Sequence, residues 1–206
     1  MGYADSANTV SIGNGVNMVP RDNWAQYPAD PDKMTESDGN YRFITLHHTG
    51  SEDTPESVES LQRDKLGPVE SFARRVGQSL GLAQTYPGQG DISYNFLIDK
   101  DGLIYQGRSL DYVGAHVGGN NRGNIGIAFL GDYSDKPLSD AQVHSSIQLI
   151  DRLNAHYGYF SQGSTYGPMP IVTHGFLDVK KHDELGAALS QIQAIRNSVQ
   201  QSWEKR

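Results

Sequence analysis

The sequence contains no cysteine among its 206 residues. This absence excludes disulfide bonds, thiolate metal ligands and a cysteine nucleophile. It also removes one indicator of the redox compartment in which the protein works. Any metal site in the chain must therefore be built from histidine, aspartate or glutamate side chains.

Positive charge and long apolar runs are also scarce. The 17 Lys and Arg residues are outnumbered by 24 Asp and Glu, which gives a formal net charge of -7. That balance disfavours nucleic acid as a partner, because phosphate binding needs a basic surface. No apolar run approaches the roughly 18 residues that a membrane-spanning helix needs, so no such helix is expected. The start, MGYADSANTVSIGNG, lacks the basic and apolar regions of a signal peptide, so no export signal is expected unless one was trimmed.

The chain opens with residues rich in Gly, Asn and Ser. Residues 1–18 are expected to form a flexible N-terminal arm, which leaves residues 19–206 as one folded domain. Short apolar runs predict strands at residues 42–48, 93–99, 103–108, 125–131 and 170–174. Asp101-Gly102, between two of these runs, predicts a hairpin turn.

Helical patterns alternate with the predicted strands. Apolar residues recur at helical spacing over residues of about 54–65, 69–82, 139–157 and 187–203. Ser139 is a suitable N-cap for the third helix, and residues 158–168 are expected to form a loop. The alternation predicts an α/β fold: a single domain with a central mixed β-sheet of about five or six strands, flanked by helices.

Two of the predicted buried strands end in histidine. His47 and His48 follow one apolar run, and His174 ends another. Neighbouring side chains on a strand point to opposite faces, so one residue of the first pair can face a site while the other faces the body of the fold. With a carboxylate or a third imidazole from Lys181-His182-Asp183, two such histidines form the ligand set of a hydrolytic zinc site. On spacing alone, histidines that only make structural hydrogen bonds remain the alternative.

Five segments in order resemble the zinc-dependent N-acetylmuramoyl-L-alanine amidases of the amidase-2 type. That family includes T7-lysozyme-like endolysins and the peptidoglycan recognition proteins. Within residues 19–196, the segments are VPRDNW, FITLHHT, DISYNFLIDKDGLIYQGR, GAHVGGNNRGNIGIAFLG and HGFLDVKKHD. The resemblance implies the peptidoglycan recognition protein fold and a zinc-dependent enzyme. Its reaction would be hydrolysis of the amide bond between N-acetylmuramic acid and L-alanine of the stem peptide.

The resemblance also implies the zinc ligands. His47 matches the first ligand and His174 the second, whereas His48 is assigned to the body of the fold. The third position is open, because many members use a cysteine that this chain lacks. Asp183 is preferred, since Lys181-His182-Asp183 falls on the Lys-x-Asp pattern of other members. His182 is the alternative third ligand, because an ungapped count from His174 places it on the cysteine position.

Catalytic residues follow from the same match. Tyr94 falls on the tyrosine that lies beside the metal-bound water in the endolysin-like members. The recycling amidases of the superfamily instead carry a glutamate in Ile-Gly-Ile-Glu, and Ala128 occupies that position here. The catalytic lysine is Lys181 if Asp183 is the ligand, and Lys180 if His182 is. Either lysine is expected to stabilise the oxyanion that forms on the amide carbonyl.

Substrate binding is expected in the Gly-rich loop, where His116 and Asn121 match family positions. The implied partner is peptidoglycan and the implied cofactor is Zn²⁺. Loss of the cysteine ligand leaves an alternative, a non-catalytic peptidoglycan-binding recognition module. Action in the periplasm or cell wall without a visible export signal suits an endolysin or an antibacterial toxin effector. The segment of residues 66–90, longer than the family usually has, is a candidate docking site for an immunity protein or a delivery carrier.

Overall fold

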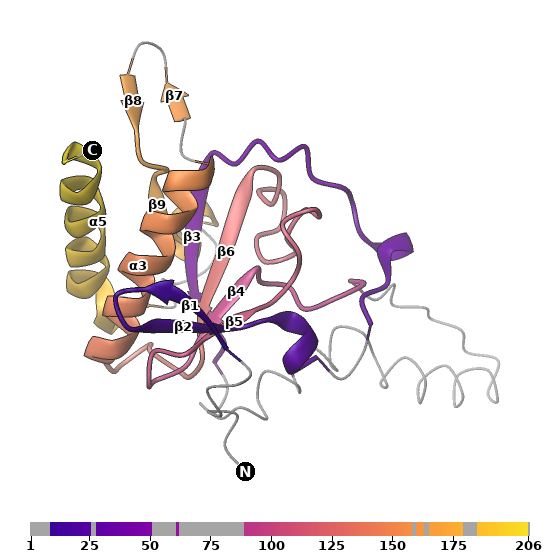
Figure 1. The fold of residues 1–206 in the computed structure, drawn as a ribbon, viewed down its shortest axis with the longest axis horizontal. Coiled ribbons are helices and arrows are strands. Elements are labelled where there is room, and N and C mark those ends of the chain that lie inside the picture. The colour runs from indigo at the N-terminus through magenta and orange to yellow at the C-terminus, as the bar shows by residue number, and fades with distance from the viewer. Residues whose placement is uncertain are drawn as a thin grey trace.

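The computed structural model describes residues 9–25, 28–50, 61, 89–157, 160–162, 165–178 and 185–205. A seven-stranded mixed sheet forms the centre, in the order β1-β2-β5-β4-β6-β3-β9 (Figure 1). Its strands are β1 (Val10–Gly13), β2 (Val16–Val19), β3 (Phe43–His48), β4 (Phe96–Ile98), β5 (Ile104–Gln106), β6 (Asn124–Phe129) and β9 (Ile171–Thr173). The α/β class and the single mixed sheet are therefore confirmed.

Helices and shorter elements surround this sheet. The α-helices are α3 (Asp140–Tyr157), α4 (His174–Leu177) and α5 (Leu189–Glu204). Single 3-10 turns are η2 (Arg21–Asn23), η3 (Pro31–Lys33) and η4 (Gly186–Ala188). Apart from residue 61, the helices expected at 54–65 and 69–82 lie outside the described residues. In the described part of the chain, no helix has the length and apolar character needed to cross a membrane.

The sheet has more strands than the five or six expected, because β1 and β2 come from residues assigned to an arm. Residues 10–18 of that expected arm pair in an antiparallel hairpin, and β2 then joins β5. The Gly13-Asn14-Gly15 turn has positive φ at all three residues, with values of 105°, 50° and 78°. Gly and Asn are residues that adopt such angles readily. The composition that suggested flexibility therefore makes a tight turn instead.

A second small hairpin also lies where a loop was expected. Strands β7 (Phe160–Gln162) and β8 (Thr165–Gly167) pair antiparallel within the expected loop of residues 158–168. Three-residue strands separated by a short connection carry too little hydrophobic alternation for a pattern to reveal them. This hairpin extends beyond the main sheet at the top of Figure 1.

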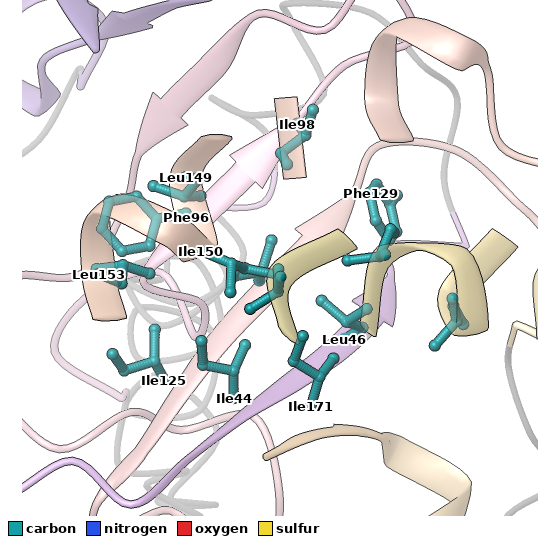
Figure 2. Close-up of a cluster of buried hydrophobic side chains, with 14 of the residues drawn as sticks. Ile44, Leu46, Phe96, Ile98, Ile125, Phe129, Leu149, Ile150, Leu153 and Ile171 are labelled. Carbon is teal, nitrogen blue, oxygen red and sulfur yellow. The ribbon is translucent and has the colours of Figure 1, made fainter. Parts of the chain in front are cut away.

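Helices α3 and α5 cover one face of the sheet. Ile44 and Leu46 of β3 point to this face, where α3 contributes Leu149, Ile150 and Leu153 (Figure 2). Burying each such side chain stabilises the fold by roughly 1.5–3 kcal/mol. A slip of one residue in β3 would exchange these side chains for their polar neighbours. The apolar pattern of β3 therefore decides which face its histidines take.

The opposite face carries a smaller apolar cluster and the polar residues of interest. Leu97 of β4 belongs to this second cluster, which comprises Val19, Trp24, Ile92, Leu97, Tyr105 and Leu130. Leu97 pairs with Ala128 of β6, and Ala128 pairs with His47 of β3. Paired residues of neighbouring strands point to the same side of a sheet. His47 therefore lies on the face opposite α3 and α5.

The N-terminus of α3 has the cap that the sequence predicts. The Ser139 hydroxyl accepts a hydrogen bond from the Gln142 amide at 3.0 Å, and the Gln142 side-chain oxygen accepts one from the Ser139 amide at 3.0 Å. This reciprocal pair is a capping box, which satisfies two of the amides that have no partner within the helix. The cap fixes where α3 begins and hence which of its side chains reach the core.

Candidate functional site

The site begins at the carboxyl ends of two adjacent parallel strands. Leu46 of β3 pairs with Thr173 of β9, so His47 and His174 each follow immediately after a paired residue. The ring centroids of these two histidines lie 4.9 Å apart. Both are buried, at 1% and 7% exposure. His174 begins the short helix α4 rather than ending β9, so the predicted strand-end position is shifted by one residue.

Two further rings complete a cluster around His47. The Tyr94 ring centroid lies 5.2 Å from that of His47, and the His116 ring centroid lies 5.0 Å from it. Nε2 of His47 is 3.0 Å from Nδ1 of His116. Four of the site residues predicted from sequence therefore come together: His47, Tyr94, His116 and His174. Tyr94 is half-buried.

The His116 ring packs against the backbone of two glycines. A β-carbon at Gly114 would lie 2.6 Å from Cδ2 of His116, and one at Gly126 would also lie 2.6 Å from it. Real β-carbons do not approach other atoms so closely, so any larger residue at either position would displace the ring. Asn121 shapes the loop from the other side, since its Oδ1 accepts hydrogen bonds from the amides of His116 and Val117. The role of Asn121 toward a substrate stays a prediction.

Burial controls the charge of His116. Desolvation first, and the neighbouring His47 second, lower the pKa of His116 to about 3. Its imidazole is therefore neutral at physiological pH and carries one ring proton. A neutral ring both donates and accepts a hydrogen bond, which suits its position between Nε2 of His47 and the carbonyl of Asn124, 3.4 Å from its own Nε2.

Tyr94 is placed by the segment that leads into β4, not by a strand as expected. Its carbonyl accepts a hydrogen bond from the Arg108 amide at 2.9 Å, and a β-carbon at Gly107 would lie 2.4 Å from that carbonyl. The next residue, Asn95, donates to the carbonyl of Arg108 and accepts from the amide of Gly126. This buried side-chain amide ties the Tyr94 segment to β6, and no sequence pattern marks it.

A buried ion pair stabilises the same segment near its start, at Asp91. The Arg21 guanidinium makes two hydrogen bonds of 2.9 Å to the Asp91 carboxylate, which is 1% exposed. Arg108 is also buried and donates to the carbonyls of Gln89, Asp91 and Ile92. Burial lowers the pKa of Arg108, and Asp91 opposes that shift. No sequence pattern marked this network, because Arg21 and Asp91 lie 70 residues apart.

His48 takes the other side of the sheet, as strand alternation predicts. Its Nδ1 accepts a hydrogen bond of 2.8 Å from the amide of Tyr133. The same nitrogen lies 3.4 Å from the exposed Asp132 carboxylate. The two adjacent histidines are therefore separated by the sheet, and His48 holds the loop after β6.

The donor chemistry of His47 and His174 fits a zinc ion. Two nitrogens bound to one tetrahedral zinc at about 2.0–2.1 Å are about 3.4 Å apart. Imidazole rings with centroids 4.9 Å apart accommodate that spacing, and both Nδ1 atoms are shielded from solvent. Within the described ranges, no three His, Asp or Glu side chains make a complete metal site. The remaining predicted residues all lie outside the described ranges: Lys180, Lys181, His182 and Asp183.

Comparison with known proteins identifies the family of the chain. The family model described as N-acetylmuramoyl-L-alanine amidase matches residues 37–187. Peptidoglycan-recognition protein SC2 of Drosophila simulans is 31% identical over 163 residues, which cover 75% of this chain and 81% of that protein. The matched region of the family model includes every predicted metal, catalytic and substrate-binding residue.

Solved structures share the fold. Peptidoglycan recognition protein LE, solved in complex with tracheal cytotoxin, superposes with a TM-score of 0.61 at 24% identity, covering 86% of this chain and 92% of that chain. The N-acetylmuramoyl-L-alanine amidase LysC from Clostridium intestinale gives a TM-score of 0.59 at 22% identity, covering 87% and 97%. At these identities the likeness concerns the fold, which both a recognition protein and an enzyme adopt.

Proposed function

Because this chain belongs to the N-acetylmuramoyl-L-alanine amidase family, we propose that it hydrolyses the amide bond between N-acetylmuramic acid and L-alanine in peptidoglycan. The observation that carries the proposal is the pairing of His47 and His174 at the ends of adjacent strands, with Tyr94 beside them. Two buried imidazoles and a half-buried phenol supply metal ligands and a proton-transfer group within one cluster. The proposed place of action is the periplasm or cell wall.

In this proposal His47 and His174 hold Zn²⁺ with a third ligand from the segment after residue 178. Bound there, the metal would supply a Lewis acid to activate water and polarise the scissile carbonyl. Both imidazoles are buried in the same cluster, and a histidine that binds a metal does so through the lone pair of a neutral ring. Asp183 is the proposed third ligand and His182 the alternative.

Tyr94 handles the proton and the developing charge. Its ring lies against His47 and is half-buried, so its hydroxyl group can meet a substrate that approaches from the surface. A phenol donates a hydrogen bond to an oxyanion and accepts one from water, which suits both steps of amide hydrolysis. Lys181 is proposed to add positive charge near the carbonyl oxygen, and His116 and Asn121 belong to the proposed substrate-binding loop.

Digestion of purified sacculi tests the reaction. Mass spectrometry of the products is expected to find free stem peptides together with glycan that has lost them. Shortened peptides still attached to disaccharides would identify a peptidase and overturn the proposal. His47→Ala and His174→Ala are expected to abolish release of stem peptides. His144→Ala is the matched control, because His144 is exposed on α3, on the other side of the sheet, where its Nε2 lies 3.2 Å from the carbonyl oxygen of Asn14.

Zinc stoichiometry tests the third ligand. Metal analysis after dialysis is expected to find about one zinc per chain in the wild type. Asp183→Ala is expected to lose that zinc and His182→Ala to retain it. The opposite result would assign the third position to His182 and the lysine role to Lys180.

A non-catalytic recognition module is the second candidate. Two observations favour it: the chain has no cysteine to serve as third ligand, and the relative SC2 is named a recognition protein. Such a protein would bind sacculi without releasing stem peptides and would carry no stoichiometric zinc. Co-sedimentation with sacculi, measured beside the digestion, separates the two functions.

A further inference from the structure

A chain of three polar groups runs away from the proposed metal site. Nε2 of His47 is 3.0 Å from Nδ1 of His116, and Nε2 of His116 is 3.4 Å from the carbonyl oxygen of Asn124. The two histidines are 1% and 8% exposed. The histidine distances alone leave the direction of the first bond open, because either ring can carry the shared proton.

The carbonyl oxygen fixes that direction. A carbonyl only accepts, so Nε2 of His116 carries a proton and donates it to Asn124. A neutral imidazole has one ring proton, so Nδ1 of His116 has none and accepts. Nε2 of His47 must then donate, and the lone pair of His47 resides on Nδ1. That nitrogen is the one shielded from solvent within the cluster that contains His174.

We infer that His116 is a positioning residue that holds His47 in the tautomer and orientation needed to present Nδ1 to the metal. This inference rests on the proposed zinc site and adds a role to the substrate contact predicted for His116. A hydrogen bond from the second ring nitrogen of a ligand to an acceptor is the usual way in which proteins fix metal-binding histidines. Here the acceptor is itself a histidine, and a backbone carbonyl fixes its own tautomer.

The surroundings of His116 hold its ring in place. A β-carbon added at Gly114 or at Gly126 would come within 2.6 Å of its Cδ2, so the ring packs closely against the backbone of both residues. Asn121 holds the backbone of the same residue through its side-chain oxygen. The side chain of Asn124 is fixed as well, since its Oδ1 accepts from the Thr45 hydroxyl at 2.8 Å and its Nδ2 donates to Asn120 at 2.8 Å. The two ends of this row of hydrogen-bonded groups, His47 and Asn124, are therefore anchored in β3 and β6.

Three substitutions separate the contact to His47 from the contact to Asn124. His116→Asn keeps an acceptor oxygen where Nδ1 stands, because both atoms are bonded to Cγ. His116→Gln places its amide where Nε2 stands, so it retains the contact to Asn124 and loses the one to His47. His116→Leu removes both contacts at similar volume. Melting temperatures of the metal-free proteins report whether each variant folds, and the Asn and Gln variants decide the question if the Leu variant does not.

The first measurement needs no metal. Two-bond ¹H–¹⁵N correlation spectra of the metal-free protein at about pH 8, above the ordinary pKa of histidine, report which nitrogen of His47 carries the proton. Protonation on Nε2 is expected in the wild type and in His116→Asn. A substantial share of Nδ1 protonation is expected in His116→Gln and His116→Leu. An unchanged Nε2 proton in the Gln and Leu variants would overturn the inference.

The second measurement is zinc affinity, by competition with a chromophoric chelator. His116→Gln and His116→Leu are expected to bind zinc about 10- to 100-fold more weakly than the wild type, with His116→Asn close to it. Equal affinity in all four proteins would also overturn the inference. A wild type that binds no zinc would instead overturn the proposed function, and the tautomer comparison would still decide what His116 does to His47.

Discussion

The backbone of Gly126 touches the face of the His116 imidazole. A β-carbon at Gly126 would come within 2.6 Å of Cδ2 and 2.7 Å of Nε2 of that ring. Gly126 pairs with Thr45 in the centre of the sheet, so neither the strand nor the ring can move without disturbing a buried ladder. This contact shows that the position of His116 is decided by β6 as much as by its own loop.

Gly126→Ala is therefore expected to destabilise the protein. Overpacking a tight buried site lowers the free energy of unfolding by about 1–3 kcal/mol. Gly118→Ala is the matched control. Gly118 is exposed in the Gly-rich loop that carries His116, and an added β-carbon there would meet nothing within 4 Å. Its effect should stay within about 0.5 kcal/mol. Urea titration measures the free energy of unfolding of both variants. Equal values would contradict close packing of Gly126 against His116.

Asp91→Asn is expected to remove much of the support of the Tyr94 segment. The substitution removes the carboxylate charge that the Arg21 guanidinium binds, close to the buried Arg108. Removing one partner of a buried ion pair lowers the free energy of unfolding by roughly 3 kcal/mol. Asp101→Asn, in an exposed pair with Lys100, is the control and should change it by less than about 1 kcal/mol. Similar urea midpoints for both variants would argue against the network.

Acid is expected to destabilise the metal-free protein through His116. Its pKa is about 3 in the folded protein and about 6.5 in an unfolded chain, so the unfolded state binds the extra proton between these values. The free energy of unfolding therefore rises with pH in this window and is lost as pH falls through it.

His116→Asn removes this titration. Between pH 7 and pH 5, the variant should lose about 1–2 kcal/mol less than the wild type. Urea unfolding at both pH values, with a chelator present, makes the comparison. The same loss in both proteins would mean that His116 is protonated as easily in the folded state as in the unfolded one.

Zinc is expected to raise the melting temperature only when both strand-end histidines are present. Free zinc at a hundredfold excess over Kd stabilises a folded protein by about 2.7 kcal/mol. The wild type and His144→Ala should show this gain, and chelation should reverse it. His174→Ala should melt at the same temperature with and without zinc, because it lacks one of the two described donors. A full zinc response in that variant would remove His174 from the ligand set.

Tyr94→Phe is expected to separate catalysis from metal binding. Loss of a proton-transfer group slows a reaction about 10²- to 10⁴-fold. Stem-peptide release should fall within that range, while zinc affinity and the melting temperature stay near wild-type values. Tyr105→Phe is the control, since that buried hydroxyl contacts Asp99 in the β4–β5 hairpin. Equal turnover of the two variants would exclude Tyr94 from the reaction.

Structural elements were predictable from the sequence where neighbouring residues alone determine them. The β3 run, the Asp101-Gly102 turn and the Ser139 cap each depend on residues within a few positions of one another. The β1–β2 hairpin was missed, because Gly and Asn in a turn have the same composition as Gly and Asn in a flexible arm. Asn95, Asp91 and Arg108 were missed as supports of the site, because their partners are distant in sequence and no pattern marks a buried polar network.

The sequence by itself determined which histidine of the His47–His48 pair faces the site. The alternation of Ile44 and Leu46 with their neighbours sets the register of β3, since burial of those side chains excludes the opposite register. Only the tertiary structure decided what His47 meets. Its neighbours His116 and His174 come from a loop and from the start of α4, more than 60 residues away, and parallel pairing of β3 with β6 and β9 brings them together. Such contacts depend on strand order, which no local pattern encodes.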